Sequence, residues 1–267
     1  MGEIVALLGM HRSGTSLVAE ILSANGIETG HHVVGGSRYN PRGHFEDRVV
    51  VNINKKLLLH FKGSWDAPPE LPADWCNDPY ALKLRESAAA YASQLLAERG
   101  RFFFKDPRTC LLLPFWQRAF GPMTYLVVMR STDSIVNSLL RRQNDWLSAR
   151  RMTWRWARHA YHSFRGACEP IRPLSAERAR ELVRQYHESL MRSLAGETVI
   201  YVVYEELLAS PKTLVLQLLR SLGQASERAK HHIVRPELDH AKRRELASST
   251  AGWIRRLRDA GCTLEAC

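Results

Sequence analysis

The sequence predicts an α/β fold: a P-loop-like, doubly wound parallel sheet flanked by helices, in a single domain over residues 1–267. Three observations predict it. Short apolar or β-branched runs of strand length recur along the chain, helical patterns separate or follow them, and the first run leads through a glycine-containing loop into an amphipathic stretch. Strands that alternate with helices form a parallel sheet, whose ligands bind at the carboxyl ends of the strands.

The strands and helices of this fold are recognised from their local patterns. Four runs are expected to be buried parallel strands: Ile4–Leu8, Phe102–Phe104, Tyr125–Met129 and Val199–Val203. Helices are expected over Thr15–Ser23, Pro79–Arg99, a stretch that starts after Arg130, Ser175–Leu194, and the stretch between Ser210-Pro211 and Gly223. Arg12, Lys105, Arg130 and Tyr204 each lie at or just past the end of an expected strand, where a ligand would bind.

Two segments do not fit this alternation. Residues 27–75 are rich in Gly, His, Asn and Pro, and are expected to form a long excursion over the active face. Residues 141–170 combine arginines with aromatic residues, and an amphipathic helix is expected there with an aromatic face and a basic face. This helix either packs its aromatic face on the core or forms a surface that receives an acidic substrate.

Composition and charge narrow the class of protein. The chain has 267 residues, of which 45% are hydrophobic and 24% charged, enough for one large buried core. The five cysteines are scattered and odd in number, which favours reduced thiols in a cytoplasmic protein over a disulfide framework or a zinc site. No signal peptide is recognised and no apolar run approaches the ~20 residues of a membrane helix. The formal charge of +11 predicts an anionic partner.

The loop from Gly9 to Ser16 is almost a nucleotide-triphosphate-binding P-loop. Gly9 and Gly14 have the spacing of that motif, and Ser16 stands where its metal-binding hydroxyl would be. Thr15 occupies the lysine position, however, and Arg12 is the cation of the loop. Successive backbone amides at a helix N-terminus bind anions, so the loop is expected to hold an anion shorter than a triphosphate.

A second anion contact is expected after the strand Tyr125–Met129. Arg130 follows that strand, and a helix is expected to begin at Asp133 or Ser134. Ser138 would then lie one to two turns into this helix, able to face the same anion as Arg130.

These residues resemble those of the sulfotransferases that use 3′-phosphoadenylyl sulfate (PAPS), of the bacterial type. Gly9–Ser16 is similar to the family's 5′-phosphosulfate loop, and Arg130 with Ser138 resembles its 3′-phosphate site. Other similar blocks follow in order, from residue 4 to about residue 240: Asn40–Asp47, Lys105–Arg108, Tyr204–Leu207 and Ile233–Leu238. The resemblance implies transfer of a sulfuryl group from PAPS to a hydroxyl, with release of adenosine 3′,5′-bisphosphate (PAP) and no metal.

The resemblance also implies residue roles. Arg12, Ser13, Gly14, Thr15 and Ser16 would hold the 5′-phosphosulfate, Arg130 and Ser138 the 3′-phosphate, and Tyr204 would lie in the adenine-contacting segment. The lysine of a P-loop contacts β- and γ-phosphates. PAPS has neither, so a loop that binds PAPS does not need this lysine. Arg12 and Lys105 are the cations expected to neutralise the leaving oxygen. Arg108 is expected to brace the site through a carboxylate.

Four residues are candidates for the general base. Members that act on small phenols carry a histidine two residues after the strand-end lysine, but Pro107 stands at that position here. In the tyrosylprotein sulfotransferases, whose Lys-Asp-Pro segment resembles this one, the base is a glutamate downstream of the loop. Glu46 is therefore the expected base, with Asp47, His44 and His11 as alternatives.

Two other functions compete with sulfuryl transfer. A P-loop kinase that phosphorylates a small molecule shares the fold, but it would need the missing lysine. A nucleic-acid-binding protein would explain the positive charge, but the basic residues are spread along the chain and no recognition motif is present. The acceptor is expected to be a small-molecule or carbohydrate hydroxyl, and Trp65 is a candidate for stacking on its ring.

Overall fold

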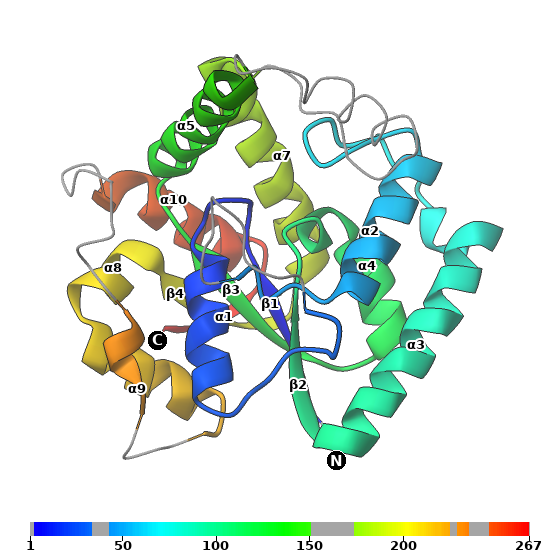
Figure 1. Cartoon of the computed structure of the whole chain (residues 1–267), viewed down its shortest axis with the longest axis horizontal. Coiled ribbons are helices and arrows are strands. Elements are labelled where there is room, and N and C mark those ends of the chain that lie inside the picture. The colour runs from blue at the N-terminus through cyan, green and yellow to red at the C-terminus, as the bar shows by residue number, and fades with distance from the viewer. Residues whose placement is uncertain (1–2, 34–42, 151–173, 225–228, 235–245, 267) are drawn as a thin grey trace.

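The computed structural model describes residues 3–33, 43–150, 174–224, 229–234 and 246–266. Within these residues a parallel five-stranded sheet has the order β2-β1-β3-β4-β5 (Figure 1). Its strands are β1 (Glu3–Leu8), β2 (Arg101–Lys105), β3 (Thr124–Met129), β4 (Thr198–Val203) and β5 (Thr263–Ala266). The doubly wound α/β fold predicted from the sequence is confirmed.

The sheet is buried on both faces. In β1, Val5 and Leu7 pack into one hydrophobic cluster, whereas Ile4, Ala6 and Leu8 pack into the other. Side chains of a strand alternate between faces, so a strand covered on both sides must be apolar throughout. This is why four strands were visible in the sequence as continuous apolar runs. The edge strand β5 is largely exposed and carries no such run, so it was not predicted.

Helices cover the two faces as separate groups (Figure 1). One group consists of α1 (Thr15–Ala24), α8 (Tyr204–Ala209) and α9 (Pro211–Ser221). The other group contributes to the larger cluster and consists of α2 (Arg48–His60), α3 (Pro79–Arg99), α4 (Thr109–Phe120), α5 (Thr132–Arg150), α7 (Ala176–Leu194) and α10 (Leu246–Asp259). Two short 3₁₀ helices, η1 (Trp75–Asn77) and η2 (His231–Ile233), complete the described elements.

Helices with local end signals were predicted well. The bounds of α3 agree with the prediction because Asp78 caps its first turn, Pro79 opens it and Gly100 follows its end. The expected helix over 175–194 starts one residue later, because the Ser175 hydroxyl is its N-cap and accepts from the Arg178 amide. Helix α5 begins at Thr132, slightly earlier than expected.

Four α-helices were missed, and the shortest of them is α8. The prediction of a long excursion over residues 27–75 was wrong for α2, whose buried Asn54 interrupts its apolar face. Helix α4 is buried along most of its length and contains Pro114, a residue that normally indicates the end of a helix. Helix α10 was also not recognised. Most of the amphipathic helix expected within 141–170 lies outside the described residues, although α5 extends to Arg150.

The strand order places the candidate site. From β1 the sheet grows toward β2 on one side and toward β3 on the other, so the strand order reverses beside β1. In open α/β sheets, the crevice at the carboxyl ends of strands on either side of such a reversal is the binding position. The loop after β1, Lys105 at the end of β2 and Arg130 after β3 all lie at this edge.

Candidate active site

The loop between β1 and α1 has a backbone that requires glycine at Gly14. Gly14 is the N-cap of α1 with φ of 100°, and a Cβ there would lie 2.2 Å from Cδ2 of Tyr204. No side chain caps α1 at this end, so the positive end of the helix dipole faces the loop. The buried Ser13 hydroxyl has no hydrogen-bond partner among the described residues. A helix N-terminus with an unused buried hydroxyl fits an anion.

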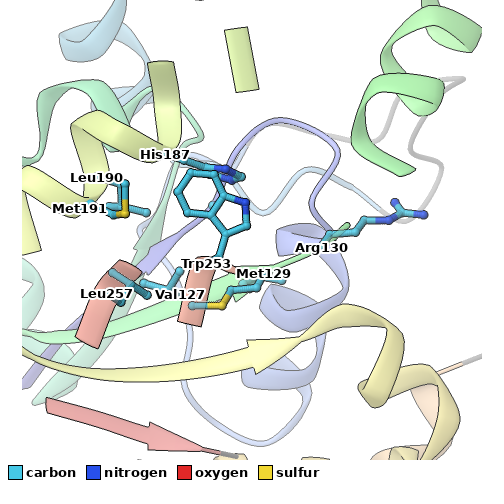
Figure 2. Close-up of a pocket in the computed structure, with 10 residues that line it drawn as sticks. Val127, Met129, Arg130, His187, Leu190, Met191, Trp253 and Leu257 are labelled. Atoms are coloured by element: carbon cyan, nitrogen blue, oxygen red, sulfur yellow. The ribbon is translucent and has the colours of Figure 1, made fainter. Parts of the chain in front are cut away.

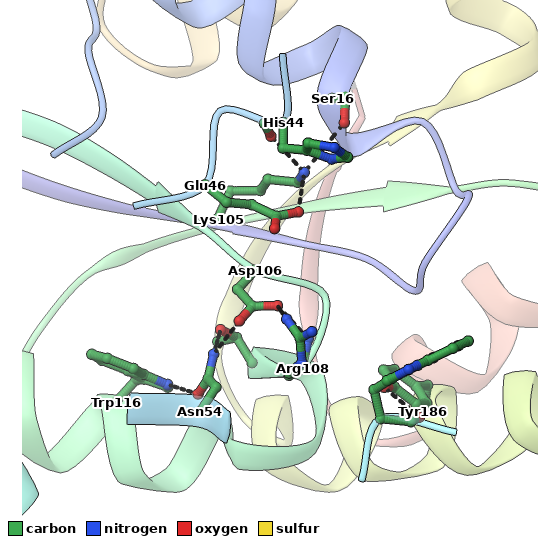
Figure 3. A network of polar contacts seen from close by, with 11 residues as sticks. Ser16, His44, Glu46, Asn54, Lys105, Asp106, Arg108, Trp116 and Tyr186 are labelled. Atoms are coloured by element: carbon green, nitrogen blue, oxygen red, sulfur yellow. Dashed lines mark hydrogen bonds and ion pairs between the residues drawn. The ribbon is translucent and has the colours of Figure 1, made fainter. Parts of the chain in front are cut away.

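Lys105 is held at the centre of the site (Figure 3). Its Nζ donates to the His44 carbonyl oxygen at 2.7 Å, to Glu46 Oε1 at 2.8 Å and to Ser16 Oγ at 3.2 Å. The lysine is only 2% exposed, and the Glu46 side chain is 15% exposed. Residues 43–47 therefore lie against the loop and β2, and the Glu46 carboxylate is in direct contact with the Lys105 ammonium.

A buried network fixes the segment that follows Lys105 (Figure 3). Asp106 is fully buried and pairs through Oδ1 with the Arg108 guanidinium at 3.0 Å, as expected for a bracing arginine. Its Oδ2 accepts from Asn54 Nδ2 at 3.0 Å, and Asn54 Oδ1 accepts from Trp116 Nε1 at 2.8 Å. The network ties α2 and α4 to the end of β2, so it holds Lys105 in place through the backbone.

Arg130 and Ser138 converge on Arg12, although they come from different elements. The Arg130 guanidinium donates to the Arg12 carbonyl oxygen at 3.0 Å, and Arg12 Nε donates to Ser138 Oγ at 2.9 Å. Arg130 also lies over the Tyr204 ring, 4.3 Å from its centroid. The loop, the residue after β3 and the helix α5 thus form one continuous polar surface, on which Tyr204 packs beside Gly14.

Positive charge accumulates on this surface. Burial lowers the pKa of Arg12, and the fields of Arg130 and Arg141 lower it further. Lys105 and Arg108, which lie beside the loop, each pair with a carboxylate, Glu46 and Asp106 respectively. Arg12 and Arg130 add further positive charge next to them. Several cations gathered at a helix N-terminus favour an anionic ligand.

The three alternative bases have different surroundings. Asp47 is 1% exposed and caps α2: it accepts from the Val49 amide at 2.6 Å and from the Tyr91 hydroxyl at 2.6 Å. Burial lowers the pKa of His11 well below its ordinary value, and Arg108 and other nearby cations lower it further. Burial also lowers the pKa of His44, against the opposing field of Glu46. The two imidazoles are therefore weakened as proton acceptors.

Sequence reasoning missed two contributors to the site. Nothing in the local sequence marks Asn54 as part of the site, because it lies on a helix that was not predicted. Its contact with the site is a hydrogen bond to Asp106, which is distant in sequence. Arg142 had a detectable signal. It follows Ser138 by four residues on α5, and residues so spaced share one helix face.

A small cavity lies at the end of β3, and Gly9 of the loop and Arg130 are among the residues that line it (Figure 2). It has a volume of about 20 Å³ and is lined mainly by apolar residues of β3, α7 and α10, with His187 packed against Trp253 at 3.9 Å between ring centroids. Burial lowers the pKa of His187 to about 3. A cavity of this size holds on the order of one water molecule. It is too small for a nucleotide.

The model of a sulfotransferase family matches residues 5–227. The chain belongs to the sulfotransferase family. No curated protein matches this sulfotransferase. Within the described ranges, no helix combines the length and apolarity of a membrane span, and no three His, Cys, Asp or Glu residues are grouped to hold a metal ion.

Three solved sulfotransferase structures are similar to this chain at low sequence identity. A sulfotransferase domain from the curacin biosynthetic pathway is 14% identical with a TM-score of 0.49, covering 91% of this chain and 80% of that one. A sulfotransferase domain from the Synechococcus PCC 7002 olefin synthase is 14% identical with a TM-score of 0.46, covering 97% and 94%. A sulfotransferase from Mycobacterium avium is 14% identical with a TM-score of 0.47, covering 97% and 75%.

Proposed function

We propose that this sulfotransferase moves the sulfuryl group of PAPS to a hydroxyl acceptor by in-line displacement and releases PAP. One observation carries the proposal: a helix N-terminus surrounded by Arg12, Arg130 and Lys105, in a loop with Thr15 in place of the P-loop lysine. Such a surface suits two separate short anions better than a triphosphate with its metal. PAPS carries a phosphosulfate at one end and a single 3′-phosphate at the other.

The contacts support assigning different residues to different parts of PAPS. The amides from Arg12 to Ser16 and the Ser13 hydroxyl would bind the 5′-phosphosulfate. Arg130 and Ser138 would bind the 3′-phosphate, because both reach the same side of the loop through Arg12. Tyr204, packed against Gly14 and Arg130, would lie beside the adenosine.

The residues around Lys105 would carry out the transfer. Glu46 accepts the proton of the acceptor hydroxyl while the acceptor oxygen forms its bond to sulfur. Lys105 and Arg12 neutralise the oxygen on the 5′-phosphate of PAP as its bond to sulfur breaks. The Lys105–Glu46 contact of 2.8 Å supports this pair of roles, because it brings the carboxylate and the ammonium together beside the loop. Asp47 is committed to capping α2, which favours Glu46 as the base.

We also propose a class of acceptor and a cellular compartment. A small-molecule or carbohydrate hydroxyl is the proposed acceptor, with no nucleic acid as a partner. Cys76, Cys110 and Cys262 are free and buried thiols, which supports action in the reducing cytoplasm.

PAP is expected to raise the melting temperature without added Mg²⁺. The stabilisation should follow mass action and reach ~2.7 kcal/mol at a hundredfold excess over Kd. Differential scanning fluorimetry with PAP, ATP with Mg²⁺, and a mixed oligonucleotide measures it. Stabilisation by ATP with Mg²⁺ but not by PAP would instead favour a P-loop kinase, and stabilisation by the oligonucleotide alone would favour a nucleic-acid-binding protein.

Arg130→Ala is expected to weaken the binding of PAP and PAPS selectively. The substitution removes a charge-assisted contact to the 3′-phosphate, which adenosine 5′-phosphosulfate lacks. Affinity for PAP should therefore fall by roughly tenfold or more, at about 1.4 kcal/mol per tenfold, while affinity for adenosine 5′-phosphosulfate hardly changes. Calorimetric titration of both nucleotides tests this. An equal loss for both would show that Arg130 acts by supporting Arg12 and Tyr204.

A further inference from the structure

Four side chains beside the loop form an aromatic and cationic cluster that the proposed binding of PAPS does not use. The Arg142 guanidinium lies over the Trp65 ring, 4.8 Å from its centroid. The His11 ring packs 4.7 Å from Trp65 and 5.9 Å from Tyr186, and the Tyr186 hydroxyl donates to the Trp65 carbonyl oxygen at 2.8 Å. These residues come from α5, the loop, α7 and the segment after α2, so the cluster is a tertiary feature.

The Trp65 ring is covered by other side chains of the protein. It is 5% exposed, with His11 packed against its ring and Arg142 over it. From the sequence, Trp65 was a candidate for stacking on a ring of the acceptor. In the structure, neither face of its ring is open to a ligand. A guanidinium over an indole gains a cation–π contact and keeps its N–H donors at the edge available.

The charge of Arg142 is not matched by an ion pair among the described residues. Glu46 and Asp106, two carboxylates near the loop, pair with Lys105 and Arg108. Asp66 is the acid whose field acts on Arg142, and its Oδ1 accepts from Ser64 Oγ at 2.6 Å. Burial lowers the pKa of Arg142, and the fields of Arg12 and Arg108 act in the same direction. A half-buried cation in such surroundings gains from an external anion.

The cluster is joined to the loop through His11, whose ring packs on Trp65 and which directly precedes Arg12 in the chain. The field of Arg142 also acts on His44, which is under the fields of Glu46 and Lys105 as well. Arg130, by contrast, contacts Tyr204 and the Arg12 carbonyl oxygen. An anion bound by Arg142 would therefore use a cation other than Arg130, beside the loop that the proposed transfer uses.

His11 adds a hydrogen-bonding group to the cluster. Its Nε2 is buried and has no hydrogen-bond partner among the described residues. The surrounding cations Arg12, Lys105, Arg108 and Arg142 all oppose its protonation. A neutral imidazole has one donor and one acceptor nitrogen. His11 can therefore form a hydrogen bond with a ligand, but it carries no positive charge that would attract the anion away from Arg142.

We propose that Arg142, oriented by Trp65, determines acceptor specificity by binding an anionic group, such as a carboxylate, that the acceptor carries beside its reacting hydroxyl. This inference rests on the proposed sulfuryl transfer and names the acceptor class for the same site. A planar guanidinium matches a carboxylate with two parallel hydrogen bonds. The anion would orient the hydroxyl toward Glu46 and Lys105.

The test measures the binding of matched probes to the protein saturated with PAP. One pair is 4-hydroxyphenylacetate and 4-hydroxyphenylacetamide, and the other is glucuronate and glucose. Within a pair, both compounds carry a hydroxyl and one carries a carboxylate. The acid of at least one pair should bind roughly tenfold to a hundredfold more tightly than its neutral partner. Arg142→Gln should abolish this preference and Arg142→Lys should retain part of it, while both leave PAP affinity within about twofold.

A charge-matched control separates specific binding from the general attraction of a basic protein. Arg180 is exposed and pairs with Asp133, so Arg180→Gln removes one positive charge away from the cluster. That variant should keep the preference for the acid. Equal binding or no binding of acid and neutral probe in both pairs overturns the inference, as does an equal loss of PAP affinity in Arg142→Gln. Failure of PAP itself to bind the wild-type protein would instead overturn the proposed function.

Discussion

Glu46→Gln should lower turnover by roughly 10²–10⁴-fold, the range typical for removal of a general base. Glutamine keeps the size of the side chain and an oxygen that accepts from Lys105 Nζ, which lies 2.8 Å from Glu46 Oε1. It cannot take up the proton of the acceptor hydroxyl. PAP affinity should hardly change, since Glu46 faces the acceptor in the proposed arrangement. Transfer from labelled PAPS to a series of phenols measures the turnover.

The acidity of the acceptor separates this base from the neighbouring lysine. A more acidic phenol needs less help in losing its proton, so it should partly restore turnover in Glu46→Gln. Lys105→Met, which removes the ammonium but keeps an unbranched side chain, should not be restored because its defect lies at the leaving oxygen.

Glu181→Gln is the matched control for the glutamate substitution. Glu181 pairs with Arg184 on the exposed face of α7, so its loss should leave turnover unchanged. Near-normal turnover in Glu46→Gln, together with its loss in His44→Ala or His11→Ala, would move the base to a histidine.

Asp106→Ala should lower the free energy of unfolding by about 3–5 kcal/mol, as expected when one partner of a buried ion pair is removed. The substitution leaves the Arg108 guanidinium without its carboxylate 3.0 Å away and deprives Asn54 of an acceptor. Asp106 is fully buried, so water cannot readily replace these contacts. Urea unfolding followed by circular dichroism measures the change.

Glu188→Ala is the control for this loss of stability. It also removes a carboxylate from an arginine, Arg184, but the pair is exposed and lies on one face of α7. Its loss should cost less than about 1 kcal/mol. If the two substitutions lower the free energy of unfolding by the same amount, the network around Asp106 does not hold the end of β2. Asp106→Asn, which keeps the shape and loses the charge, should fall between them.

Local sequence patterns were sufficient where a single element supplies the signal. The loop from Gly9 to Ser16, the caps of α3 and α7 and the apolar runs of four strands are each contained within a short segment. Such signals failed where packing overrides periodicity. Helix α4 contains Pro114 in its interior, and α2 carries the buried Asn54 on its apolar face, so each includes a residue that argues locally against a core helix.

The sequence by itself determined the fold class, the loop that joins the first strand to the first helix, and the placement of Arg12, Lys105, Arg130 and Tyr204 at one edge of the sheet. These follow from the order of strands and helices, because the carboxyl ends of parallel strands meet at a common edge. The tertiary structure decided which side chains touch. It paired Lys105 with Glu46, committed Asp47 to a helix cap and set Arg142 over Trp65. Such contacts join residues distant in sequence, so they depend on packing, which no local periodicity encodes.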